Sequence, residues 1–258
     1  METLVVGDVH LKADEALSAV DNTLGCRPSI GRVVFAGDIC DEWGASPEAL
    51  RDGICAFVRW VETRRDQGVI VDIVFGNHDF QYLLGEQGPG TQMAMVPFVR
   101  ETLFPLGLRM AHVVDGFLVT HAGLTATWAD EYLGQPATAG EAARQLNDML
   151  DEGSLRTLYK LCACGRARGG REVPGPLWAD RRELMNDPYP AFNQIVGHSP
   201  LRRVIRERVT AKGRDGSKSP VTLWFCDTFS RYSNGLPIGD GSLLLMTDGK
   251  GRAILPEG

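Results

Sequence analysis

Residues 70–79 read IVDIVFGNHD, an apolar run that ends in a glycine followed by an asparagine, a histidine and an aspartate. Such a run is typical of a buried strand that ends in a turn. Four more segments have the same form, each with a metal-binding side chain directly after an apolar run: Gly7-Asp8-Val9-His10, Gly37-Asp38, His121-Ala122-Gly123 and Gly197-His198-Ser199-Pro200. Because α/β sheets place their sites in loops at the carboxyl ends of strands, we expect an α/β fold with a site built from these five segments.

The polar side chains in these segments are of the types that bind metals. Aspartate, histidine and asparagine suit a site for two hard or borderline divalent cations. Four of the five histidines of the chain lie in the segments, and only His112 lies outside, where we expect a structural role. Asp8 and His10 are two residues apart on an extended segment, so both side chains can point to one side. A single Gly-Asp turn would indicate little, but five such segments in one chain favour a metal site.

The order of the segments resembles the calcineurin-like metallophosphoesterase superfamily, whose pattern runs D-x-H, GD, GNH with a following acid, H and GH. The matching positions extend from Asp8 to His198. The resemblance implies a fold of two mixed β-sheets packed as a sandwich with helices outside. It also implies a dinuclear metal centre in which Asp38 is the bridging carboxylate. The other implied ligands divide between the two cations: Asp8 and His10 for the first, and Asn77, His121 and His198 for the second.

The resemblance also implies what the centre does. Two divalent cations about 3.5–4 Å apart hold a hydroxide and clamp a phosphoryl group; manganese is expected to serve in vitro, and iron or zinc also suit the ligands. His78 would donate a proton to the leaving oxygen or bind the transferred phosphate, since histidine titrates near neutrality. Asp41, the second aspartate of a GDxxD motif, would orient His78; a helix-capping or loop acid is the alternative reading of that position.

Within the superfamily, the chain is most similar to the serine/threonine phosphoprotein phosphatase and symmetric diadenosine tetraphosphatase branch. Residues 177–180 read LWAD where that branch has LWSD, and residues 197–200 read GHSP where its bacterial members have GHTP. One departure concerns substrate binding, because Glu42 stands where the branch has an arginine that contacts phosphate. Another cation must replace this arginine. The candidates are Arg181 or Arg182 first, and then the loop arginines Arg166, Arg168 and Arg171.

The whole chain, residues 1–258, is predicted to form one domain, since its length and composition are ordinary for a globular protein. Residues 123–190 hold too few apolar positions for a separate core and include a loop rich in Gly, Arg and Pro at 165–176. We expect this region to be a cap or specificity insertion. Helices are predicted at 14–24, 47–67, 91–104 and 140–162, and strands in the last part of the chain at 201–209, 221–226, 242–247 and 252–255.

Charge and hydropathy exclude several classes of partner. A net charge of −6 argues against broad binding to nucleic acid, although bound metals can still attract a phosphate substrate. No apolar stretch is long enough to span a membrane, and the N-terminus carries no signal peptide, so we expect no membrane partner and a cytoplasmic location. The six cysteines are expected to be reduced; a soft-metal site at Cys162-Ala163-Cys164 is the alternative for that pair.

These features together predict an enzyme, a metal-dependent phosphoric ester hydrolase that cleaves phosphomonoesters by direct attack of metal-bound hydroxide. By resemblance, its phosphorylated substrate is a protein carrying phosphoserine or phosphothreonine, or a small molecule. The first alternative is cleavage of a nucleotide anhydride, such as a diadenosine polyphosphate, or of a phosphodiester, with Trp43, Trp178 or Tyr189 as a base-stacking surface. The second alternative is a non-catalytic metal-binding scaffold, which the presence of all six ligands and His78 disfavours.

Overall fold

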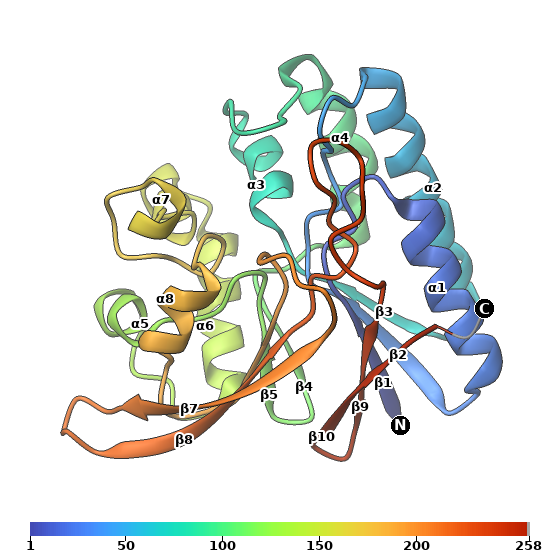
Figure 1. The fold of residues 1–258 in the computed structure, drawn as a ribbon. Helices are drawn as coiled ribbons and strands as arrows, with labels where there is room; N and C mark the ends of the chain where they lie inside the picture. The colour runs from blue at the N-terminus through green and yellow to red at the C-terminus, as the bar shows by residue number, and fades with distance from the viewer. Residues whose placement is uncertain (257–258) are drawn as a thin grey trace.

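A computed structural model describes residues 1–256 and contains two five-stranded sheets (Figure 1). The first sheet has the order β10-β9-β1-β2-β3. β1, β2 and β3 run parallel, whereas β9 pairs antiparallel with β1 and with β10. The strands of this sheet are β1 (Glu2–Val6), β2 (Ile30–Phe35), β3 (Ile70–Ile73), β9 (Leu243–Thr247) and β10 (Lys250–Ile254).

The second sheet has the order β4-β5-β6-β8-β7 and is also mixed. β5, β6 and β8 run parallel. β4 and β7 are the two edge strands, and they pair antiparallel with β5 and β8, respectively. Its strands are β4 (His112–Val114), β5 (Phe117–Val119), β6 (Gln194–Val196), β7 (Ile205–Lys212) and β8 (Lys218–Phe225). The two mixed sheets confirm the predicted fold class.

Alternation along the strands places one set of side chains between the sheets and the other under the helices. In β1, Val5 joins a core cluster with Ile195 and Trp224 of the second sheet. Its neighbours Leu4 and Val6 lie instead in the core beneath the helices. Both faces of the central strands are therefore buried, which explains why the strand runs read as continuous apolar stretches.

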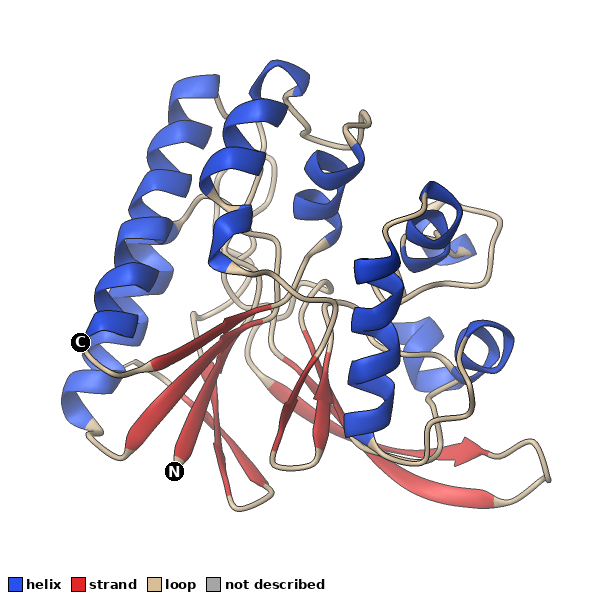
Figure 2. Ribbon diagram, turned by 180° about the vertical axis from the view of Figure 1, so that it is seen from behind, coloured by secondary structure: helices blue, strands red, loops and turns tan. Residues whose placement is uncertain are grey.

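Helices cover the outer faces of this double sheet, and Figure 2 shows them on both sides. α1 and α2 lie along the first sheet, and α6 packs on β4 and β5 of the second. In α2, Ser46 caps the N-terminus by accepting from Ala49 N, and Pro47 takes the first helical turn. The helices are α1 (Ala13–Cys26), α2 (Pro47–Asp66), α3 (Asn77–Leu84), α4 (Val96–Thr102), α5 (Ala126–Tyr132), α6 (Ala139–Glu152), α7 (Leu155–Leu161) and α8 (Arg181–Asn186).

Two of the predicted helices differ from the structure. The helix predicted at 140–162 is two helices, α6 and α7, because Gly153 adopts a left-handed conformation with φ +67° and Ser154 caps α7. The helix predicted at 91–104 is α helix only from Val96, after a 3-10 turn at Met93–Met95. The strands predicted at 201–209 and 221–226 lie at Ile205–Lys212 and Lys218–Phe225, which pair antiparallel along their full length.

Residues 123–190 follow β5 and precede β6. Most of their buried apolar residues, such as Trp128, Leu146 and Leu161, belong to the same core cluster as the first sheet and its helices, whereas Leu184 packs with residues of the second sheet. The role of the region as a cap stays a prediction. Residues 166–168 form a 3-10 turn, η3 (Arg166–Arg168), at the start of the predicted loop. Within residues 1–256, no helix combines the length and apolar character that a membrane span requires. All six cysteines are free thiols.

Candidate metal centre

The five polar segments meet where the parallel strands of the two sheets end. The Asp38 carbonyl accepts from His10 N at 2.7 Å, which joins the loops after β1 and β2, and Gly197 N donates to the His121 carbonyl at 2.8 Å. Glycine permits the closest approaches. A Cβ on Gly76 would lie 2.0 Å from Asp38 Oδ1, and a Cβ on Gly197 would lie 2.2 Å from Asp8 Oδ1. Because Gly76 and Gly197 have no side chain, they leave room for the Asp38 and Asp8 carboxylates of the neighbouring loops.

Four of the predicted site residues adopt a left-handed backbone conformation that residues other than glycine rarely take. The φ angles are +46° for His10, +51° for Asp38, +66° for Asp41 and +64° for His198. Such residues cost of order 1–3 kcal/mol each and persist only where their surroundings hold them. Backbone strain of this kind concentrates at functional sites, and here it falls on the residues whose side chains converge.

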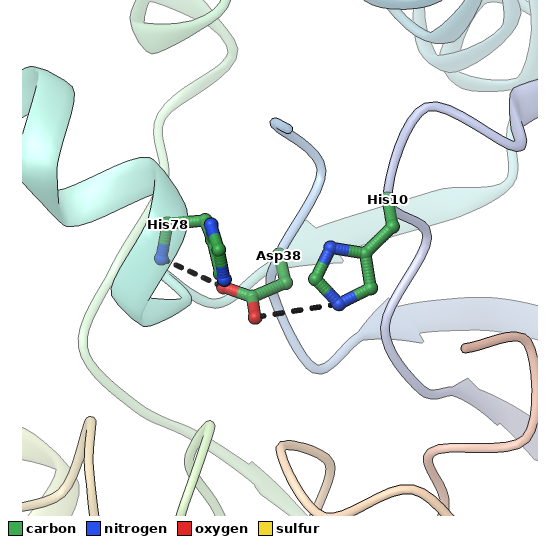
Figure 3. Close-up of side chains that lie close together, drawn as sticks. All are labelled: His10, Asp38 and His78. Atoms are coloured by element: carbon green, nitrogen blue, oxygen red, sulfur yellow. Dashed lines mark hydrogen bonds and ion pairs between the residues drawn. The ribbon is translucent and has the colours of Figure 1, made fainter. Parts of the chain in front are cut away.

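Asp38 lies at the centre of the cluster. His10 Nε2 is 3.7 Å from Asp38 Oδ2 and 3.7 Å from Asp8 Oδ2, and His121 Nε2 is 3.4 Å from Asp38 Oδ2. Potential ligand atoms lie within 4.8 Å of one another in two groups that share Asp38: His10, Asp38 and His78 in the first, and Asp38, His121 and His198 in the second. Figure 3 shows His10 and His78 on opposite sides of the Asp38 carboxylate. One carboxylate between two clusters has the geometry of a bridging ligand.

The second cluster is completed by Asn77. His121 Nε2 lies 2.9 Å from Asn77 Oδ1 and 3.1 Å from His198 Nδ1. His121 Nδ1 faces the Ala36 carbonyl at 2.8 Å, as the far nitrogen of a metal-binding histidine often does. A single proton on His121 Nε2 cannot serve both neighbours equally well. A divalent cation among one amide oxygen and two imidazole nitrogens would satisfy all three, so the residues present fit a bound metal.

Charge at the centre also fits bound cations. Burial raises the pKa of Asp8 well above its usual range, and the nearby Asp227 carboxylate adds to this. Burial lowers the pKa of His10 to about 4 and that of His198 well below its usual value, so both imidazoles are neutral, which is the form that binds metals. Burial alone would raise the pKa of Asp38, but the His121 and His78 imidazoles outweigh it and the pKa is lowered.

His78 lies beside this centre and is held from two directions. Its backbone N donates to Asp38 Oδ1 at 2.9 Å, and its ring Nδ1 lies 3.3 Å from Asp41 Oδ2. Burial by itself would lower the pKa of His78, but the Asp38 and Asp41 carboxylates raise it to about 9. The structure thus brings Asp41 to the ring that it was predicted to orient. Tyr82, which sequence reasoning missed, donates from its hydroxyl to Asp41 Oδ1 at 2.6 Å and fixes that carboxylate.

Asp79 supports the centre from the inside. Its carboxylate accepts from the backbone N of Ile39 and Cys40, both at 2.9 Å, and from Gly76 N at 3.0 Å. The side chain therefore ties the loop that carries Asp38 to the N-terminus of α3. The sequence marked this position only as an acid after GNH, and its structural role comes from a contact with residues forty positions earlier.

A pocket of about 290 Å³ opens over the centre. Asp8, His10, Asp38, Asn77, His78 and His198 all line it, and so does Asp41. Asp227, at the end of β8, joins them with its Oδ1 buried and without a hydrogen-bond partner. Burial is the main cause that raises the pKa of Asp227 to about 6. Asp227 therefore also belongs to the lining of the site.

The cations of the pocket are not those predicted first. Arg168 and Arg231 line it, whereas Arg181 pairs with Glu207 at 2.7 Å and, with Arg182, lines a neighbouring hollow instead. Arg168 was a weaker candidate, and Arg231 was missed because no local motif marks it. Glu42, the acid at the expected arginine position, forms an ion pair with Lys12. His112 lies outside the pocket, near Asp72 and the Ile73 carbonyl, in keeping with a structural role.

Comparison with known proteins gives a family and a shared fold. The family model for calcineurin-like phosphoesterases matches residues 1–226. The cold-active protein-tyrosine phosphatase of the psychrophile Shewanella sp. aligns with 98% of this chain and 80% of its own, at 18% identity and a TM-score of 0.59. Another structure of a cold-active protein tyrosine phosphatase, at 1.1 Å, aligns with 98% of this chain and 78% of its own, at 18% identity and a TM-score of 0.60. No curated protein sequence matches the chain.

Proposed function

The chain belongs to the calcineurin-like phosphoesterase family and is a metal-dependent phosphoesterase; from this premise we propose that it hydrolyses phosphomonoesters at a centre of two divalent cations. The observation that carries the proposal is the shared position of Asp38 between two groups of potential ligands. When bound, two such cations supply an activated water and neutralise charge on the phosphoryl group. Manganese is the cation proposed for assays in vitro, and iron or zinc would suit the same ligands.

Each protein group in this proposal has a defined task. Asp8 and His10 would hold the first cation, and Asp38 would serve both. His78 stands at the open side of the centre, where its ring can give a proton to the leaving oxygen while Asp41 holds the other ring nitrogen 3.3 Å away. The second cation is bound by the cluster of amide and imidazole ligands: Asn77, His121 and His198.

Arg168 is the proposed cation for substrate phosphate, in place of the arginine that the phosphoprotein phosphatase branch has at the position of Glu42. Its Nη2 donates to the His198 carbonyl and to Ser199 Oγ, both at 3.2 Å, so the guanidinium is fixed next to a metal ligand. Asp180 lies 3.2 Å from Nε and steadies the same group. Lys12 meanwhile neutralises Glu42 and limits its repulsion of a phosphate dianion. Arg231 lines the pocket from the other side but is engaged by Glu15.

Replacing Arg168 by alanine is expected to raise KM for a phosphomonoester about tenfold or more, since a hydrogen bond to a charged group contributes roughly 1.5–3 kcal/mol. Steady-state kinetics and metal content measure the change. Arg171→Ala is the matched control, because this arginine is exposed on the same loop and lies outside the pocket lining. Equal KM values for the two variants would assign the phosphate contact to another group.

Hydrolysis of p-nitrophenyl phosphate and of bis-p-nitrophenyl phosphate tests the proposed function. We expect cleavage of the monoester that is abolished by EDTA, restored by manganese and faster than cleavage of the diester. Preference for the diester would instead indicate a phosphodiesterase. A manganese-loaded protein that cleaves neither compound but cleaves diadenosine polyphosphate would indicate the nucleotide anhydride alternative. A protein that binds two cations and cleaves none of these would be a scaffold.

A further inference from the structure

We propose that the pocket over the metal centre contains a subsite for a planar aromatic leaving group, with the Trp43 indole as its stacking surface. The proposal rests on the phosphomonoesterase activity proposed above and adds a substrate class: esters of phenols and arylmethyl alcohols, of which phosphotyrosine is the form carried by proteins. Three features of the molecule support it: the exposure of Trp43, the apolar rings around the metals, and the distribution of charge.

Trp43 presents an exposed indole to the pocket. It is 68% exposed, whereas Trp128 and Trp224 are buried and the other two tryptophans are partly buried. Its backbone is nonetheless held, because Glu42 Oε1 accepts from Trp43 N at 2.9 Å and Glu42 pairs with Lys12. An indole face is among the largest apolar surfaces that a side chain offers. Leaving it exposed to water loses the favourable free energy that its burial would give. An uncovered indole on a held backbone, in the lining of the pocket, is suited to cover part of a ligand.

Flat apolar groups also surround the metal ligands. Pro89, Pro200 and Trp178 line the same pocket as Trp43. The Trp178 ring packs edge-on against the His198 ring, with centroids 5.7 Å apart and planes at 82°, so its position is fixed relative to the metal centre. A planar ring on the leaving oxygen would meet these faces directly, whereas an extended polar chain would leave them uncovered.

Charge in the pocket favours an aromatic monoester over a polyphosphate. Of the two guanidiniums that line it, Arg168 is assigned to the phosphoryl group and Arg231 is paired with Glu15, so neither is left for further phosphates. Glu42 next to Trp43 is paired with Lys12, so among the described residues this part of the pocket offers no free cation either. A dinucleotide polyphosphate would bring several further negative charges into this part of the pocket, in addition to the phosphoryl group at the metals. A monoester brings one phosphoryl group and leaves an uncharged ring at Trp43.

The pocket continues past Trp43, which leaves room for the rest of a larger substrate. A second hollow of about 390 Å³ is lined by His10, Glu42, Trp43 and Arg231, all of which also line the first, and it extends to Tyr232. Tyr232 is 57% exposed and sits on a tight turn in which its N donates to the Leu236 carbonyl at 2.9 Å. A phosphorylated side chain could occupy the first pocket while its backbone follows the second.

Benzyl phosphate and cyclohexylmethyl phosphate test this subsite, because the two esters have similar size and leaving-group basicity and differ in the planar aromatic ring. We expect wild-type protein with manganese to prefer the benzyl ester in kcat/KM by roughly three- to tenfold, the range given by aromatic pairing. Trp43→Ala should remove the preference and Trp43→Phe should keep most of it. Tyr159→Ala is the control, since Tyr159 is 44% exposed on α7 and lines neither pocket.

The outcomes separate the subsite from the activity on which it rests. A preference that is lost in Trp43→Ala and kept in Tyr159→Ala supports the subsite. Equal use of both esters by the wild type, or an unchanged preference in Trp43→Ala, overturns the subsite. Cleavage of p-nitrophenyl phosphate in the same experiment would still support the phosphomonoesterase activity. Failure of wild-type, metal-loaded protein to cleave any of the three monoesters overturns both proposals.

Discussion

Replacing Asp38 by asparagine is expected to lower kcat/KM for p-nitrophenyl phosphate by about 10³-fold and to prevent the protein from holding two cations. The reason is the position of this carboxylate between both groups of ligands. A neutral amide cannot bridge two cations as a carboxylate does, and loss of either cation removes several kcal/mol of transition-state stabilisation, with each ~1.4 kcal/mol equal to tenfold in rate. Asparagine keeps the size of the side chain, and its amide oxygen can still accept from His78 N.

Metal content after dialysis, measured per chain, and steady-state kinetics together check this expectation. A third measurement is the rise in Tm on adding manganese, which should be large for the wild type and smaller for Asp38→Asn, because binding to the native state stabilises it. Asp72→Asn is a matched control: Asp72 is a partly buried carboxylate that accepts from Arg32 Nε at 2.7 Å and lies outside the centre. Two tightly held cations and normal kinetics in Asp38→Asn would contradict the bridging role.

The fold and the core of the site were predictable because their signals are local. Each strand that carries a site residue is an apolar run, and each site residue follows it within a few positions, as in 70–79. Parallel strands then bring those ends to one edge of a sheet without further information. The prediction of which side chains come together needed no knowledge of loop conformation, only of residue type and order. The break between α6 and α7 was also locally marked, by Gly153 and the capping Ser154, but the apolar periodicity of the segment outweighed that signal.

The parts that sequence reasoning did not find depend on contacts between distant residues. Arg181 was predicted at the phosphate because it follows the LWAD segment, but its guanidinium pairs with Glu207 on β7 and lies over the Phe225 ring, and the residue is not part of the pocket lining. Arg231 reaches the pocket from a loop after β8 that has no motif. Tyr82 donates to Asp41 because the fold places α3 beside the loop after β2. None of these pairings follows from spacing along the chain.

The left-handed conformations of the site residues are likewise invisible in the sequence. Asparagine, aspartate and histidine adopt this region more often than most other residues, but nothing in the sequence marks which of them will do so. Hydrogen bonds between the loops hold His10 and His198 in place. The Asp38 carbonyl accepts from both Val9 N and His10 N, and His198 N donates to Asp8 Oδ1 at 2.9 Å. The Asp8 carboxylate that fits a metal therefore also fixes the backbone of His198, and the Asp38 backbone carbonyl fixes that of His10.

Replacing His78 by glutamine is expected to lower kcat by about 10²–10⁴-fold while both cations remain bound, which is the usual contribution of a positioned general acid. The backbone contact of this residue with Asp38 does not depend on the side chain, so the metal ligands should keep their places. Kinetics and metal content per chain check the two halves of the expectation. His112→Gln is the control, since this histidine is half-buried outside the pocket and should change neither quantity.

The choice of ester distinguishes a proton donor from a group that only binds phosphate. Phenoxide is a more basic leaving group than p-nitrophenoxide, so it depends more on receiving a proton as the bond breaks. A proton donor at position 78 therefore predicts a larger loss in His78→Gln for phenyl phosphate than for p-nitrophenyl phosphate. Equal losses for the two esters would assign His78 to phosphate binding, because that contact does not sense the leaving group. A loss of bound cations in the variant would instead make the ring a metal ligand, which its place in the first ligand group would explain.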